Sequence, residues 1–188
     1  MIEDFSASEK YRKYLIALQF NEVNVYTVWG TDMLDEEEDK LLVKGEKLLC
    51  FKHLNEAKQK LSNIEHPFLD VANFESWVAE ERLDQCYNTN DLRLLSDFNL
   101  DLLKDKSSGM EILGCVNLIQ DFSIQTKNRL LLSFFDEPLM VDLKDFIYNH
   151  HFWKKEKGKV VQPASVDGTV TDLIRKLYGV FYEQMIVI

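Results

Sequence analysis

The strongest constraint on the fold is a change of hydrophobic periodicity about a third of the way along the chain. Before that point, apolar residues run together in residues 14–20 and alternate with polar ones in residues 23–29, a pattern typical of β-strands. After it, apolar residues recur every three or four positions, which is typical of amphipathic helices. Strands followed by helices predict an α+β fold.

About four strands are expected in the first part, at residues 14–20, 23–29, 41–43 and 47–51. The connections between them are too short to contain a crossover helix, so we expect an N-terminal antiparallel β-meander. Gly45 can form the tight turn between the last two strands, because glycine tolerates a positive φ.

Five to six C-terminal helices are expected to pack with this sheet. The first should cover residues 53–63, with Leu54, Ala57 and Leu61 on its buried face. The others are expected to begin near Asn73, Asn90, Glu111, Pro138 and Thr169. Residues 129–135 fit either a strand or a helix.

We expect one α+β domain over residues 1–188. Residues 1–66 would supply the sheet and the first helix, and residues 67–188 would supply a helical part that shares the same core. Apolar residues make up 46% of the chain, which is ample for a packed core. A polar loop is expected at residues 154–159.

Cysteine and histidine usage gives no sign of a metal or cofactor site. The three cysteines are Cys50, Cys86 and Cys115, an odd number without a CxxC pair, so we expect buried free thiols. The four histidines are His53, His66, His150 and His151. Only the last two are close in sequence, and adjacent residues on a helix point about 100° apart, which makes a poor metal site.

Recognisable catalytic motifs are also missing. The sequence has no glycine-rich phosphate loop, no nucleophile elbow and no zinc-protease motif. We therefore expect a protein that is not an enzyme and has no catalytic residues. The alternative is a small enzyme or ligand-binding domain whose site is assembled from scattered residues such as Trp29, Tyr87, His150 and His151.

The net charge of −10 disfavours nucleic acid or an anionic membrane as a direct partner, because both attract basic surfaces. Acidic residues at the N-terminus are unlike a signal peptide, and the longest apolar runs are too short to span a bilayer. We therefore expect a cytoplasmic protein. Its charge is compatible with a basic protein partner.

One acidic constellation is the acidic segment, residues 32–39, between two predicted strands. It carries six carboxylates: Asp32, Asp35, Glu36, Glu37, Glu38 and Asp39. Such crowding of like charges opposes folding. The segment is either a solvated loop that maintains solubility or a docking site for a cationic partner.

A second constellation is expected on the third helix. Asp97, Asp101 and Asp105 follow one another at four-residue intervals and would form an acidic ridge along one helix face. An ordinary solvated face is the alternative. If the ridge and the acidic segment share one side of the molecule, they would form a broad negative surface that fits a basic cleft.

Several segments resemble the small acidic immunity proteins of bacterial toxin–immunity systems. They are Tyr14–Leu18, Tyr26–Gly30, Lys47–Lys52 running into Leu54–Lys58, Phe74–Val78 and Cys115–Phe122. The resemblance spans about the first two thirds of the chain. It implies a protein without chemistry of its own, which binds a cognate toxin and blocks its active site or substrate entry. Many such toxins are nucleases with basic clefts.

The leading hypothesis is therefore an immunity-type protein that neutralises a bacterial toxin. Its partner-binding residues would be those of the acidic segment first, and Asp97, Asp101 and Asp105 second. A further alternative is a structural subunit or regulator that self-associates through its apolar C-terminal residues 185–188.

Overall fold

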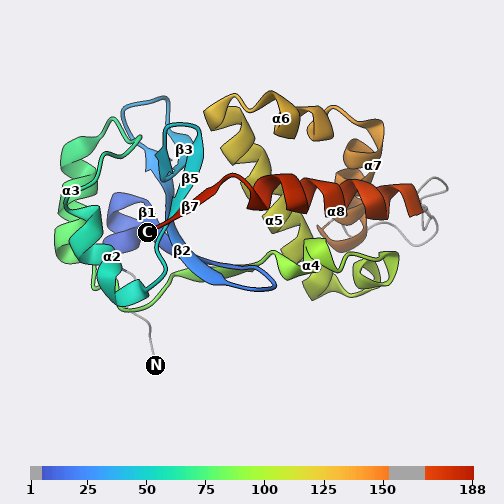
Figure 1. Cartoon of the computed structure of the whole chain (residues 1–188), viewed down its shortest axis with the longest axis horizontal. Coiled ribbons are helices and arrows are strands. Elements are labelled where there is room, and N and C mark those ends of the chain that lie inside the picture. The colour runs from blue at the N-terminus through green and yellow to red at the C-terminus, as the bar shows by residue number, and fades with distance from the viewer. Residues whose placement is uncertain (1–5, 153–167) are drawn as a thin grey trace. The chain divides into compact units, whose positions relative to one another are not determined.

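The computed structural model describes residues 6–152 and 168–188, in which most strands lie in the first half of the chain and most helical residues in the second, as predicted for an α+β fold (Figure 1). Its contacts divide into two compact units. Unit 1 is Met1–Asn90 with Gln184–Ile188, and unit 2 is Asp91–Glu183. The single domain expected from the sequence stays a prediction, and the loop expected at 154–159 lies outside the described residues.

The larger sheet has the strand order β3-β2-β1-β6. Its members are β1 (Lys13–Gln19), β2 (Asn24–Asp32), β3 (Glu38–Leu41) and β6 (Asn88–Asp91). β1 and β2 are antiparallel with Tyr14 opposite Trp29, and β2 and β3 are antiparallel with Thr31 opposite Asp39. Three of the four strands thus form the antiparallel meander that the local pattern predicts.

A second sheet has the order β4-β5-β7. It contains β4 (Val43–Lys44), β5 (Lys47–Cys50) and β7 (Met185–Val187), and β5 and β7 are parallel. The strand expected at 41–43 is interrupted at Leu42, which separates β3 from β4 and places them in different sheets. The C-terminal residues considered for self-association supply β7, a strand that no local pattern indicated.

Three helices belong to unit 1: α1 (Ser6–Tyr11), α2 (Leu54–Leu61) and α3 (Val71–Glu80). Ala57 and Leu61 of α2 are buried, as the spacing predicts, in a core cluster that includes residues of β1, β2 and α3. α3 begins two residues before Asn73, near which this helix is expected to begin, and Asp70 occupies its N-cap position.

In the part of unit 2 that the structure describes, the regular elements are helical apart from the end of β6. Its elements are α4 (Arg93–Ser96), η1 (Leu100–Lys104), α5 (Lys106–Thr126), α6 (Arg129–Phe135), α7 (Pro138–Ile147), the π-helical turn η2 (Tyr148–Phe152) and α8 (Gly168–Tyr182). α5 contacts α4, α6 and α7 and buries Phe122 against Phe181 of α8, with the ring centroids 5.5 Å apart. The helices expected near Glu111, Pro138 and Thr169 are confirmed, and the ambiguous residues 129–135 are helical.

The third predicted helix is wrong. Asn90 lies in β6, α4 ends at Ser96, and a separate 3-10 helix follows. The break lies at Asn99, which is extended and accepts a hydrogen bond from the backbone of Asp101 through its side chain. Asparagine and aspartate often form such local bonds, which compete with a continuous helix. The three aspartates therefore do not share one helix face.

Candidate partner-binding site at the acidic segment

The acidic segment joins two strands by an ordered turn. Asp32 ends β2, Glu38 and Asp39 begin β3, and residues 33–37 form the turn between them. Glu36 and Glu37 both have a positive φ, of 50° and 59°. Such backbone angles are unusual for residues other than glycine, so surrounding contacts must hold the turn in place.

Asp32 is buried and does not present its charge at the surface, contrary to the expected partner-binding role. Its Oδ2 atom accepts hydrogen bonds from Lys40 Nζ at 2.8 Å and from Leu69 N at 2.6 Å, and its Oδ1 atom accepts one from Leu34 N at 3.1 Å. The buried Asp32 side chain therefore fixes the backbone of the acidic segment through hydrogen bonds made inside the protein.

Burial raises the pKa of Asp32, but the hydrogen bonds from Lys40 and from the Leu69 and Leu34 amides outweigh it, so this pKa lies below its ordinary value. Burial also lowers the pKa of Lys40, and its bonds to Asp32 and Asp35 reverse that effect and raise it. Both groups are therefore stabilised in their charged forms near neutral pH.

A second buried ion pair lies beside the first. Lys13 of β1 is fully buried, and its Nζ atom lies 2.8 Å from Asp70 Oδ2, whose side chain is 3% exposed. The same ammonium donates to Thr31 O at 2.5 Å and lies 4.8 Å from the centre of the Phe68 ring. Removing one partner from such a pair leaves an uncompensated buried charge.

These two carboxylates tie the acidic segment to the residues that precede α3. Asp32 binds the amides of both Leu34 and Leu69, and Asp70 accepts from Met33 N at 3.1 Å. Two stretches of chain that are far apart in sequence are thus fixed to each other through buried charge. These hydrogen bonds hold the turn in place.

Large apolar side chains are exposed on both tied stretches. Met33 is 42% exposed and Leu34 71%, while Leu69 is 59% and Val71 47% exposed. The sequence offered one signal for them, the apolar Met33-Leu34 pair within an acidic run. No local pattern pointed to Leu69 or Val71, because their relation to the acidic segment depends on long-range hydrogen bonds.

The exposed acids differ in how far they are already paired. Glu37 forms an ion pair with Arg12 at 3.0 Å, Asp35 pairs with Lys40, and Asp39 accepts from Thr31 Oγ1 at 2.7 Å. The side chains of Glu36 and Glu38 are exposed and have neither an ion-pair nor a hydrogen-bond partner within residues 6–152 and 168–188. Their charges remain available to another molecule.

The second set of aspartates, Asp97, Asp101 and Asp105, lies at or near the ends of short helical elements, and two of the three contact nearby residues of the same segment. Asp97 follows α4 directly, and Asp101 pairs with Lys104 at 2.6 Å. Asp105 is the N-cap of α5 and accepts from Ser108 N at 2.7 Å and from Ser108 Oγ at 2.9 Å. The expected ridge is therefore absent, and each carboxylate has its own structural environment.

The scattered residues of the enzyme alternative are only partly brought together. Tyr14 contacts both Trp29 and Tyr87, with ring centroids 5.3 Å and 4.5 Å apart. His150 and His151 belong to η2 in unit 2, where His150 stacks on Phe146 and His151 Nε2 lies 3.0 Å from Leu103 O.

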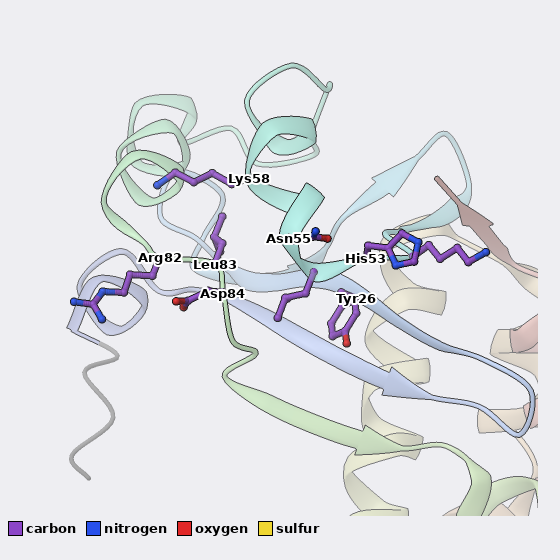
Figure 2. Close-up of a pocket in the computed structure, with 9 residues that line it drawn as sticks. Tyr26, His53, Asn55, Lys58, Arg82, Leu83 and Asp84 are labelled. Atoms are coloured by element: carbon purple, nitrogen blue, oxygen red, sulfur yellow. The ribbon is translucent and has the colours of Figure 1, made fainter.

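A pocket of about 510 Å³ lies in unit 1, lined mainly by residues 52–58 and 82–84 (Figure 2). The ammonium of Lys58 is already bonded to two backbone carbonyls, those of Ala79 and Glu81. Figure 2 shows the charged ends of Lys58 and Arg82 on the opposite side from His53. Because these polar groups do not converge, the pocket does not favour the enzyme alternative.

Cys50 and Cys115 are buried free thiols, as the sequence predicts, whereas Cys86 is a free thiol that is only partly buried, contrary to that prediction. Burial raises the pKa values of Cys50 and Cys115, and for Cys115 the nearby Glu111 and Asp91 raise it further. Such thiols stay protonated and are poor nucleophiles. Among the described residues, no three His, Cys, Asp or Glu side chains are arranged to hold a metal ion. Nor does any helix in these residues have the length and apolarity needed to cross a membrane.

Comparisons with known proteins add a fold and no activity. No family model matches the sequence, and no curated protein matches it. Among solved structures, the C-terminal domain of SatS, crystallised in complex with bromine, is similar, with a TM-score of 0.68. The alignment covers 99% of this chain and 98% of that one, at 13% identity. The two chains thus share a fold along their whole length, while the resemblance to immunity proteins stays a prediction.

Proposed function

We propose that this protein binds a basic protein partner through its acidic segment, and that it acts as an immunity-type protein that occludes the active site of a bacterial toxin. The observation that carries the proposal is a set of exposed carboxylates on a turn held by two buried ion pairs, Lys40–Asp32 and Lys13–Asp70. In this role, Asp32 positions the segment, and the exposed acids contact the partner.

The construction of the turn favours docking over simple solubility. A loop that only keeps a protein soluble needs no fixed backbone, and buried charges are expensive to desolvate. A turn fixed in advance, by contrast, loses little conformational entropy when a partner binds. The buried Lys13 and Asp32 are therefore easier to explain if the geometry of the segment matters for binding.

Charge supports a basic partner in particular. Glu36 and Glu38 are unpaired among the described residues, and the whole chain carries a net charge of −10. Complementary fields of this kind raise association rates by roughly 10- to 1,000-fold over those of neutral surfaces. Free buried thiols suit a reducing compartment, so we place this binding in the cytoplasm.

The proposal is tested with any toxin that is found to be encoded immediately beside the gene of this protein. We expect the purified pair to associate quickly at low salt, and the association rate constant to fall roughly tenfold or more when Glu36, Glu37 and Glu38 are all changed to Lys. The salt dependence of that rate should flatten at the same time. The control matched in charge compares the double change of Asp97 and Asp101 to Lys with the double change of Glu36 and Glu38 to Lys. An association rate that the triple change leaves intact would rule out this site.

A further inference from the structure

We infer that the partner is held mainly by an apolar patch made of Met33, Leu34, Leu69 and Val71, with the exposed acids of the acidic segment serving as its charged rim. This inference rests on the proposed function and specifies the chemistry of the partner. The matching surface is a protein segment with one apolar face flanked by Lys or Arg side chains. An amphipathic cationic helix has this form.

The patch is gathered by backbone hydrogen bonds to two buried carboxylates. Leu34 N and Leu69 N bind the two oxygens of the same Asp32 side chain, at 3.1 Å and 2.6 Å. Met33 N binds Asp70 Oδ2 at 3.1 Å. Val71, the fourth residue of the patch, follows Asp70 directly in the sequence. All four residues therefore lie on or next to one buried network.

The same network keeps these side chains in solvent. Phe68 is 2% exposed and Asp70 4%, whereas Leu69 between them is 59% exposed, so the chain alternates inward and outward here. The amide of Leu69 is held by Asp32, which prevents the leucine from turning into the core without breaking that bond. Its exposure follows from the charged network beneath it.

Such a concentration of exposed apolar side chains is unusual for a free surface. Eleven large hydrophobic residues are exposed among the described residues, and four of them lie on these two short stretches. Apolar residues scattered singly over a surface need no explanation. A gathered patch with a polar rim marks an interaction site.

Charge decides what covers the patch. Glu36 and Glu38 beside it are exposed and unpaired among the described residues. A second copy of this chain would bring the same exposed acids to the patch and a net charge of −10, so the two copies would repel each other. A cationic amphipathic segment satisfies both parts of the surface, because its apolar face meets the leucines and its basic side chains meet the glutamates.

The test uses two synthetic peptides of equal length and charge. One places leucines along one face of a lysine-rich helix, and the other has serine at each leucine position. We expect wild-type protein to bind the leucine–lysine peptide at least roughly tenfold more tightly than the serine–lysine peptide in calorimetry at about 0.1 M salt. The double variant Leu34→Ser/Leu69→Ser should lose this preference and keep its binding of the serine–lysine peptide.

Two further variants make the result specific. Leu130→Ser removes a leucine of unit 2 that is also 59% exposed, and it should keep the full preference. Met33→Ser/Val71→Thr changes the other half of the patch and should reduce the preference even if the leucine variant folds poorly. Circular dichroism and the melting temperature establish that each variant is folded.

Each contrary outcome has a separate meaning. Equal binding of the two peptides by the wild type, or a preference that survives both patch variants, overturns the apolar anchor and leaves charge-based docking intact. Unchanged binding of the serine–lysine peptide by Glu36→Lys/Glu38→Lys overturns the proposed function at this site. A dimer in sedimentation that Leu34→Ser/Leu69→Ser converts to a monomer would show that a second copy covers the patch, which also overturns the inference.

Discussion

Two acidic regions that look alike in the sequence are built differently in the molecule. In unit 1, the acidic segment is bound to two buried ion pairs, Lys40–Asp32 and Lys13–Asp70. The side chains of Glu36 and Glu38 are unpaired among the described residues, and exposed apolar side chains lie next to them. In unit 2, Asp101 forms a local ion pair with Lys104 and Asp105 caps a helix. The comparison shows that the number of carboxylates does not make a site. What matters is how many carboxylates remain without an ion pair or hydrogen bond within the protein.

The largest effect should follow from breaking the buried network of unit 1. Lys13→Met leaves Asp70 without its buried ammonium, so we expect the free energy of unfolding to fall by about 3–5 kcal/mol. Lys104→Met breaks the exposed pair with Asp101 and should leave stability unchanged within error. Urea unfolding of both variants measures the contrast, and equal losses would mean that the two regions are not built differently.

Asp32→Asn should have the next largest effect, and its size should depend on pH. Because hydrogen bonds hold the pKa of Asp32 below its ordinary value of 3.8, the charged carboxylate stabilises the fold above that pH, and this contribution is lost as the pH falls through the lower folded value. We expect the variant to be less stable by about 1–3 kcal/mol at pH 7.

Asparagine carries no charge that protonation could remove. Acid should therefore cause little further loss of stability at this position in the Asp32→Asn variant. The unfolding free energies of wild type and Asp32→Asn should therefore converge as the pH falls below about 3.8. Chemical unfolding at a series of pH values from 7 to 2.5 follows this convergence. A constant difference over the whole range would show that the charge of Asp32 does not stabilise the fold.

A smaller effect is expected from Asp105→Ala in unit 2. The change removes the side chain that accepts from Ser108 N, so the first turn of α5 should fray. Hydrogen exchange should quicken at the amide of Ser108 and hardly change in the middle of α5. Asp105→Asn, which can still accept this bond, is the control, and equal exchange in the two variants would argue against the capping role.

The smallest effect should come from Asp101→Asn. Its carboxylate is exposed and contacts an equally exposed Lys104, so we expect no measurable change in stability and no change in the binding of a cationic peptide. A loss of binding comparable to that of Glu36→Lys/Glu38→Lys would return the second acidic region to the partner-binding surface.

Local patterns were sufficient for much of the fold. The alternation in residues 23–29 and the helical spacing after Glu111 each report a face that packs against a neighbouring element, and both elements are present. The third helix failed because Asn99 and Asp105 bond to the backbone and break the helix. Such local competition is difficult to weigh against apolar spacing that fits a helix.

Long-range pairings could not be predicted in this way. β7 forms only because Met185–Val187 meets β5 from the other end of the chain. The candidate site has the same origin, since Leu69 joins the acidic segment through a bond to a side chain 37 positions away. The sequence pointed to Glu36 and Glu38 correctly as exposed acids, but it gave no reason to expect Asp32 inside or Lys13 beneath the turn.

Mapping the bound leucine–lysine peptide by amide chemical shifts tests the central claim most directly. Isotope-labelled wild-type protein is titrated with the peptide, and the shifts of all assigned amides are followed. The acidic segment as the partner-binding site predicts the largest shifts at Leu34, Glu36 and Leu69, with the amides of residues 97–105 unmoved. Shifts concentrated at residues 97–105, with the acidic segment unmoved, would contradict it.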